Sequence, residues 1–305
     1  MSASRLATLD DNGRAILLMV ASMAGFAAED LFLKRATAEL PLGEILVVNG
    51  IIGGIIFTIL ALRRGEKPFA IAALRGILLV RNLAEATSVA FYLLALSLGS
   101  LAFVAAILQA TPLVVTAAAA ILLRERVGWR RWLSILVGLV GVLVILEPWK
   151  SGSDAAGLVM LVAVILLAAR DVATRLIPAR IGSMSVSAWG IFSTVPAGIA
   201  LMLFRDEGFV LPTLIPAIDL LAALIFGLIG YYLLVSAMRL GEVSVVAPFR
   251  YTRLLFVAIL AIVFLGESLS VAMIIGSVIV VGSGLYAFSR ARRRNLGLSH
   301  RKNAR

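Results

Sequence analysis

The sequence predicts an all-α membrane protein whose ten transmembrane helices form two inverted repeats of five. Three observations lead to this fold class. The chain of 305 residues is 61% hydrophobic and only 15% charged, and its mean hydropathy of +1.05 lies far outside the range of soluble domains. Its apolar residues form ten stretches, each close to the roughly 20 residues needed to cross a bilayer. The last five stretches also repeat features of the first five.

These apolar stretches must be helical, because backbone groups in lipid have to be hydrogen-bonded within the spanning element. They are too long and too uniformly apolar for the alternating strands of a membrane β-barrel. We predict spans at residues 15–33, 43–62, 76–97, 101–123, 130–146, 156–176, 184–204, 217–238, 244–264 and 271–288.

The internal repeat is visible in residues that recur at a nearly constant separation. Glu125 and Glu267 lie 142 positions apart, at the ends of the fourth and ninth stretches, and Asp30 and Asp171 lie 141 apart. Five spans is an odd number, so the second copy enters the bilayer from the opposite side. We predict repeats at 15–146 and 156–288, followed by a basic cytoplasmic tail at 289–305. Inverted repeats are typical of secondary transporters, whose solute site lies between the halves near the middle of the membrane. Other pairs that are 142 apart are Leu98 and Leu240, Gly99 and Gly241, Val104 and Val246, Ala105 and Ala247, and Ala119 and Ala261.

The net charge of +11 is distributed by membrane side and does not indicate a nucleic-acid-binding patch. Of the 28 Lys and Arg residues, twenty fall on the side that holds both termini, four on the other side and four inside the spans. By the positive-inside rule both termini are cytoplasmic, and we expect a multi-pass protein of the bacterial inner membrane. The basic tail is then an anchor for topology and lipid headgroups, and no nucleic-acid partner is expected. The absence of cysteine excludes disulfides and thiolate metal sites.

Charged residues inside the spans mark the expected solute pathway, because a charge in the membrane usually faces a cavity or a partner. Arg81 and Glu85 share one face of the third span, and Arg250 and Arg253 share one face of the ninth. At a rise of 1.5 Å per residue, Glu85 and Arg253 both lie near the middle of the membrane. The ninth span has no acid of its own, so we predict that Glu85, or an anionic or strongly polar solute, partners its two arginines.

Acids in the first and sixth spans are candidates for gates. Asp30 lies near the outer face and its repeat partner Asp171 near the inner face, which suggests an outer and an inner gate that open alternately. The preceding residues, Glu29 and Arg170, are gate candidates with them. Alternatively, each Asp forms an ion pair with the base four positions later, and the pair only makes the helix insertable. These pairs would be Asp30 with Lys34 and Asp171 with Arg175, and the same alternative applies to Arg81 with Glu85 on the third span.

Polar and aromatic side chains at similar depth complete the predicted site. Gln109 and Thr111 lie on the fourth span. Aromatic residues in spans are mostly packing or interfacial anchors, but the hydroxyl groups of the adjacent Tyr231 and Tyr232 need polar partners inside the span. The predicted substrate-binding or pathway residues are Arg81, Glu85, Tyr92, Gln109, Thr111, Tyr231, Tyr232, Arg250 and Arg253.

Several segments carry a family resemblance. In the first repeat they are residues 91–96 (Phe-Tyr-Leu-Leu-Ala-Leu), Pro112 and residues 122–126 (Leu-Leu-Arg-Glu-Arg). In the second they are residues 245–251 (Val-Val-Ala-Pro-Phe-Arg-Tyr) and 264–267 (Phe-Leu-Gly-Glu). With these segments the chain resembles the drug/metabolite transporter superfamily of the EamA type, which has ten helices in two repeats. One departure is that Leu254 stands where the repeat of Pro112 would fall, and proline occurs at Pro248 instead. The position of a bend in the ninth span therefore stays open.

The resemblance implies a secondary transporter that carries a small organic metabolite by alternating access. Within the superfamily, residues 170–175 and 248–251 most resemble carriers for the uptake of riboflavin or S-adenosylmethionine. A flat isoalloxazine ring suits a cavity with aromatic residues and arginine and glutamine donors, whereas two central arginines suit a cationic sulfonium less well. Riboflavin uptake is the specific hypothesis, and uptake or efflux of amino acids or S-adenosylmethionine is the alternative.

A membrane-embedded enzyme is the rival class, and the sequence argues against it. Such chemistry usually needs clustered acids that hold a metal, or a histidine base. The single histidine, His300, lies in the tail, and no span contains a two-acid metal motif. We expect no metal and no cofactor. The second rival is a channel or a sensory membrane protein, and the inverted repeat with central paired charges suits alternating access better than either. A facilitator, proton coupling through Glu85 or Asp171, the direction of transport and a homodimer all stay open at this point.

Overall fold

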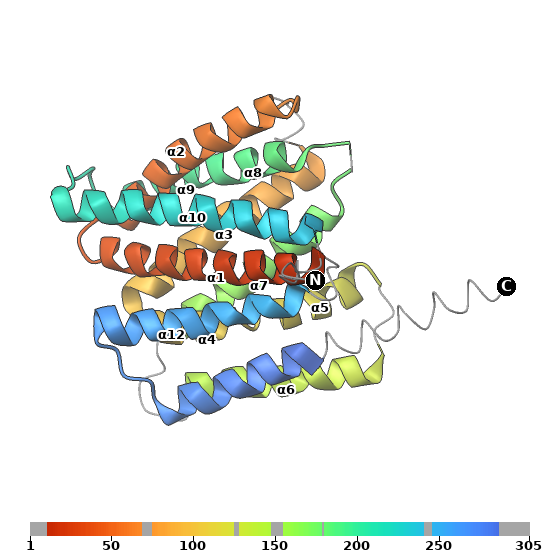
Figure 1. The fold of residues 1–305 in the computed structure, drawn as a ribbon. Helices are drawn as coiled ribbons and strands as arrows, with labels where there is room; N and C mark the ends of the chain where they lie inside the picture. The colour runs from red at the N-terminus through yellow and green to blue at the C-terminus, as the bar shows by residue number, and fades with distance from the viewer. Residues whose placement is uncertain are drawn as a thin grey trace, which may run out of the picture.

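The computed structural model describes residues 11–68, 75–124, 128–147, 155–178, 180–240 and 246–286, and these residues form helices without strands. The helices lie roughly side by side (Figure 1). Glu125, the predicted basic tail at 289–305 and most of the predicted join between the repeats lie outside the described residues. The helices are α1 (Asp11–Ala36), α2 (Leu42–Arg63), α3 (Gly76–Leu98), α4 (Leu101–Leu108), α5 (Thr111–Leu122), α6 (Trp129–Leu146), α7 (Ala155–Arg175), α8 (Ser183–Phe192), α9 (Thr194–Arg205), α10 (Leu214–Leu240), the 3₁₀ helix η2 (Ala247–Tyr251), α12 (Thr252–Leu265) and a final helix, Val271–Tyr286.

Within the described residues, all ten predicted apolar stretches form helices, and eight of these spans have the length and composition needed to cross a membrane. The two shorter apolar helices are Trp132–Leu146 and Val271–Tyr286. The structure therefore confirms an all-helical protein with multiple membrane spans, whereas ten complete crossings stay a prediction. The eight long spans are α1, α2, α3, α4 with α5, α7, α8 with α9, α10, and η2 with α12.

Three spans break next to a proline, which has no N–H to donate to the preceding turn. One break separates α8 from α9 just before Pro196, and the other two lie in spans that carry predicted pathway residues. The α4 helix ends at Leu108, and α5 starts again with Pro112 in its first turn. The hydroxyl of Thr111 donates to the Leu108 carbonyl at 2.6 Å and satisfies one of the acceptors that the break frees. Pro248 lies in the first turn of η2, which leads into α12. Both bends therefore lie beside polar residues of the predicted pathway.

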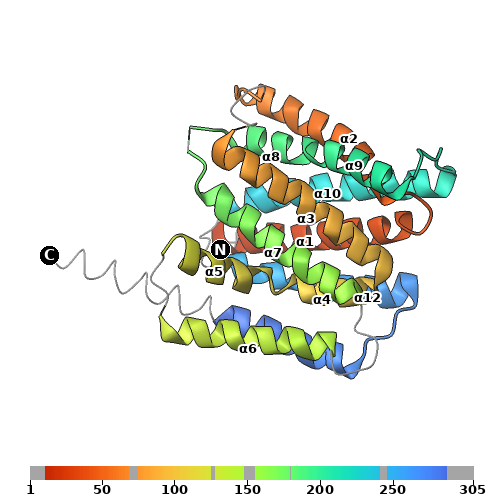
Figure 2. The same ribbon diagram turned by 180° about the vertical axis from the view of Figure 1, so that it is seen from behind.

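The two most extensive helix pairs each join the two repeats. The α1 helix packs along α10 (Figure 1), and α3 packs along α7 (Figure 2). In the repeat, α1 corresponds to α7 and α3 corresponds to α10. Each half therefore places its first helix against the third helix of the other half, and these two interfaces are counterparts of each other.

The α2 helix packs closely against α8 and α9. A Cβ atom added at Gly43 or Gly198 would collide with the carbonyl oxygen of the other glycine, so only residues without side chains allow this approach. The Glu66 carboxylate accepts from the backbone N–H of Ser185 at 2.8 Å, beyond one end of α2. Near its other end, Glu44 Oε2 accepts from the Val210 N–H at 2.9 Å. The α2–α8–α9 layer is thus fixed along its whole length.

The distribution of exposed and buried side chains is that of a protein in lipid. Phe204 and Leu211 are 90% and 94% exposed, whereas the carboxylates of Asp30, Glu44 and Asp219 are almost fully buried. Apolar surfaces face outward and charges lie between the helices, which is favourable only where the surroundings are hydrocarbon.

Candidate functional site

The first of two charge clusters between the repeats is the Asp30 cluster, formed by Asp30 on α1, Tyr92 on α3 and Arg253 on α12. Arg253 Nη2 donates to both Asp30 oxygens at 2.7 Å, and its Nε donates to Oδ2 at 3.0 Å. The Tyr92 hydroxyl donates to Asp30 Oδ1 at 2.5 Å. The guanidinium also lies 5.4 Å from the centroid of the Phe26 ring, a cation–π geometry. The Asp30 cluster thus neutralises both charges and links the two halves.

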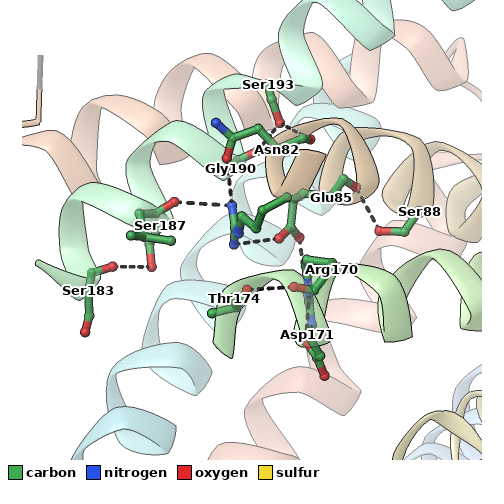
Figure 3. Close-up of polar contacts among 12 residues, drawn as sticks. Asn82, Glu85, Ser88, Arg170, Asp171, Thr174, Ser183, Ser187, Gly190 and Ser193 are labelled. Carbon is green, nitrogen blue, oxygen red and sulfur yellow. Dashed lines mark hydrogen bonds and ion pairs between the residues drawn. The ribbon is translucent and has the colours of Figure 1, made fainter. Parts of the chain in front are cut away.

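The Glu85 cluster lies on the α3–α7 interface and contains Arg81, Glu85, Arg170 and Asp171. Glu85 lies between two arginines: its Oε2 is 2.8 Å from Arg81 Nη2, and its Oε1 is 3.0 Å from Arg170 Nη1. Arg170 also binds Asp171 Oδ1 through Nη2, at 2.7 Å. Figure 3 shows Glu85 of α3 and Arg170 of α7 pointing toward each other. Two acids and two bases balance, and this cluster again connects the two halves.

Arg81 is held in the Glu85 cluster by the backbone of α8. Its Nη1 donates to the Val186 carbonyl at 3.2 Å and to Asn82 Oδ1 at 3.3 Å. The guanidinium lies directly against Gly190, where a Cβ atom would collide with it. Because a side chain at position 190 would displace the arginine, this glycine is part of the site.

Arg250 differs from the other arginines of the spans. It is exposed, and within the described residues it makes no ion pair or hydrogen bond. It nevertheless interacts electrostatically with Asp171, Arg170 and Arg253, so it lies between the two clusters. An accessible guanidinium with five unused donors can bind a carboxylate, a phosphate or a carbonyl group.

Glu29 resembles Arg250 in one respect, because it is a charged residue of a span that has no partner in the described part of the chain. It is partly buried, and among the described residues its carboxylate has no hydrogen bond or ion pair. It interacts electrostatically with Asp30 and Arg253. Its oxygens lie against Gly227 of α10, in the space that a side chain at that position would fill.

The predicted polar residues of the fourth span are held by local bonds. Gln109 Nε2 donates to the Tyr251 carbonyl at 3.2 Å and so joins the α4–α5 break to η2. Thr111 uses its hydroxyl within its own span. Gln109 therefore lies at the junction between the halves, whereas Thr111 maintains the break.

The two adjacent tyrosines of α10 have different surroundings. The Tyr231 hydroxyl is hydrogen-bonded to the Ser187 hydroxyl, its ring meets Phe57 edge-on at 4.8 Å, and it interacts electrostatically with Arg81. Tyr232 is 63% exposed. Both line a pocket beside α2 and α8, but only Tyr231 is connected to a charge cluster.

Two predicted pairings are corrected by the structure, whereas the pairing of Arg81 with Glu85 is confirmed at 2.8 Å. Glu85 was predicted to partner the arginines of the ninth span, and this is wrong, because Asp30 occupies Arg253. The alternative pairing of Asp30 with Lys34 is also wrong. Lys34 Nζ instead donates to the carbonyls of Leu96 and Gly99, at 2.5 and 2.7 Å. The residues predicted as gates thus contact the residues predicted at the middle of the pathway, since Arg170 binds Glu85 and Asp30 binds Arg253.

The sequence did not predict the role of Glu267, which forms a clamp with Lys34 around the turn between α3 and α4. Its two oxygens accept from the N–H groups of Leu101 and Ala102 at 2.6 and 3.0 Å, at the start of α4. Lys34 binds carbonyls at the end of α3. Each charge thus meets the helix end of opposite polarity. The recurrence of Glu125 at Glu267 was the available signal, because a repeated acid at a span end suggests a shared partner.

Comparison with known proteins adds family evidence to this geometry. The sequence profile of the EamA-like transporter family matches residues 13–147 and again residues 155–288. A riboflavin transporter of Rhizobium johnstonii is 26% identical over 192 residues, which is 62% of this chain and 62% of that protein. The pseudopaline exporter CntI of Pseudomonas aeruginosa is 27% identical over 91% of this chain and 96% of its own length.

The chain is also similar to a third kind of named transporter and to a solved structure. An S-adenosylmethionine uptake transporter of Rickettsia bellii is 24% identical over 72% of each chain. A solved crystal structure superposes with a TM-score of 0.63 at 21% identity, covering 92% of this chain and 98% of that one. At this identity the structural match supports the fold alone. The named relatives are all transporters, but of three different solutes.

Proposed function

The chain belongs to the EamA-like transporter family, and from that premise we propose that it carries riboflavin across the bacterial inner membrane by alternating access. It is a transporter rather than an enzyme, as its family and its named relatives show. The proposal concerns the solute, the direction and the mechanism.

The arrangement of the halves supports alternating access. Both charge clusters take one partner from each repeat, so rocking of the halves, 15–146 against 156–288, would change their contacts. The Lys34–Glu267 clamp closes the end where α3 meets α4. By the positive-inside rule this is the outer end, and both termini are cytoplasmic.

The single observation that carries the solute proposal is the exposed Arg250 guanidinium, which has no hydrogen bond or ion pair within the described part of the chain. Asp30, Glu85 and Asp171 are already paired with arginines, so these three acids do not attract a cationic solute. Arg250 offers unused donors to an electron-rich group. The pyrimidine edge of an isoalloxazine presents carbonyl oxygens and a ring nitrogen, which suit such a donor.

The relatives that are named as riboflavin transporters support the same solute. Besides the Rhizobium protein, a riboflavin transporter of Brucella anthropi is 23% identical over 88% of this chain and 96% of its own length. A second candidate is export of a carboxylate-bearing metabolite. It is favoured by Arg250 together with the nearly full-length match to the pseudopaline exporter, because a carboxylate binds a guanidinium in the bidentate geometry.

Uptake of labelled riboflavin by a riboflavin-auxotrophic bacterium that expresses this chain tests the proposal. We expect uptake above the empty vector, its loss in Arg250→Ala and partial retention in Arg250→Lys. The matched control is Arg205→Ala, which removes an arginine that pairs with Glu207 near the end of α9. Wild-type uptake no greater than that of the empty vector would refute riboflavin import and leave the export candidate to be tested.

A further inference from the structure

The two counterpart interfaces, α1–α10 and α7–α3, differ at one pair of positions. In the repeat, Glu29 corresponds to Arg170, 141 positions later. Leu98 and Leu240 end α3 and α10 as repeat partners, and 13 residues before them lie Glu85 and Gly227. The interface that pairs Arg170 with Glu85 at 3.0 Å therefore has, as its counterpart, Glu29 against Gly227.

The α1–α10 interface thus keeps an ionisable group, Glu29, but lacks the charged partner that the α7–α3 interface has. The repeat places a carboxylate at position 29, but the position opposite has no side chain that could supply a positive charge. The neighbouring Arg253 cannot replace the missing partner fully, because its guanidinium makes three hydrogen bonds to Asp30. An ionised carboxylate without a partner is strongly disfavoured in a membrane span, whereas a protonated one is tolerated.

The other groups around Glu29 do not provide a cation. On α1 the adjacent Asp30 is also an acid, and Tyr92 of α3 donates its hydroxyl to Asp30 rather than to Glu29. On α10 the nearest described acid toward its start, Asp219, is paired with Arg35 at 3.1 Å. The described helix α4 contains no ionisable side chain. In η2, Arg250 and Tyr251 carry titratable groups, and Arg250 interacts with Asp171, Arg170 and Arg253. No cluster of three metal-binding side chains occurs in the described part of the chain.

We propose that Glu29 binds and releases the proton that drives solute movement through this carrier. The proton occupies the carboxyl group while it lies against Gly227 and leaves when rocking of the halves exposes that group to water. The carboxylate takes up a proton from the water of one compartment, which forms the O–H bond. When this bond breaks, the proton is released to the water of the other compartment, so charge and atoms balance. This inference rests on the proposed transport function but not on the identity of the solute. It assigns the proton to Glu29 rather than to Glu85 or Asp171, which are paired.

A spectroscopic titration tests the proton site without any solute. The purified chain is reconstituted in lipid, and the carbonyl stretch of protonated carboxyl groups is followed by infrared spectroscopy as the pH rises. We expect a band that persists after exposed carboxylates have ionised, that is missing in Glu29→Gln, and that returns at a shifted position in Glu29→Asp. The control Glu39→Gln makes the same change at an exposed position just beyond α1 and should retain the band. An identical band in Glu29→Gln would overturn the assignment.

A transport assay tests the coupling. In proteoliposomes with an acidic exterior, one proton per solute supports about tenfold accumulation of riboflavin per pH unit. We expect Glu29→Gln to lose this accumulation but to retain exchange of labelled for unlabelled flavin. Flavin uptake by the wild-type protein that is the same with and without the pH gradient would overturn the coupling of protons to solute. If neither the wild-type protein nor any variant transports riboflavin, but the infrared band is still lost in Glu29→Gln, the solute proposal fails and the proton site stands.

Discussion

The Asp30–Arg253 ion pair should contribute more to stability than any exposed ion pair of this chain. Asp30 is 1% exposed and receives three hydrogen bonds from Arg253 and one from Tyr92. Removing one partner leaves the other as an uncompensated buried charge, which costs about 3–5 kcal/mol. We expect Asp30→Asn and Arg253→Gln each to cause a loss in this range.

A double-mutant cycle separates the pair interaction from the two single losses. The double variant Asp30→Asn, Arg253→Gln contains no unpaired charge, so it should be less destabilised than the sum of the single variants. The coupling free energy should be about 2–3 kcal/mol, at the upper end for residues in contact. Reversible unfolding in mixed detergent micelles, followed by tryptophan fluorescence, measures all four proteins.

The exposed pair of Arg205 and Glu207 is the matched control for this cycle. Its atoms are 2.6 Å apart, but its side chains are 44% and 27% exposed. Solvent screening limits such pairs to about 1 kcal/mol or less. A coupling free energy for Asp30 and Arg253 no larger than that of the control would refute the expectation that the buried pair stabilises the fold more than an exposed pair does.

Three further predictions concern other contacts. Tyr92→Phe removes one hydrogen bond to a charged group, and unfolding measurements should show a loss of about 1.5–3 kcal/mol. Gly43→Val should reduce the yield of folded protein in detergent because α9 cannot accommodate a side chain there, whereas Gly208→Val, which meets no neighbour, should not. Lys34→Met removes half of the clamp around the turn between α3 and α4. Because the chain has no cysteine, Ser100→Cys introduces a single labelling site in this turn. This cysteine should react faster with an impermeant maleimide when Lys34→Met is also present than when Lys34 is intact. An unchanged labelling rate would argue against the clamp.

The fold could be predicted from the sequence because its signals are strong and local. A long apolar stretch in lipid has to be helical, so the hydropathy pattern located all ten helices to within a few residues. Breaks next to Pro112 and Pro248 follow from the missing N–H group. The repeated residues also predict the division into two halves.

The partners within the site could not be predicted in the same way. Depth was calculated along untilted helices from assumed span ends, which separated Asp30 from Arg253 although the two are in contact. Which helices are neighbours depends on their arrangement in the bundle, and the periodicity of one helix does not report it. The unpaired position at Gly227, in contrast, was accessible from the sequence, because the repeat aligns it with Glu85.

The ion pairs across the interface bear on how two such halves recognise each other. The first half supplies the acids Asp30 and Glu85, and the second half supplies Arg253 and Arg170 as their partners. If two copies of the first half assembled together, the repeat would place Thr111 where Arg253 now lies, and Asp30 would keep its charge without compensation. The two halves are therefore not interchangeable in this interface. The charges make each half depend on the other for the neutralisation of its buried ionised groups. Separately expressed halves should therefore form the complex of the first half with the second half in preference to complexes of two identical halves.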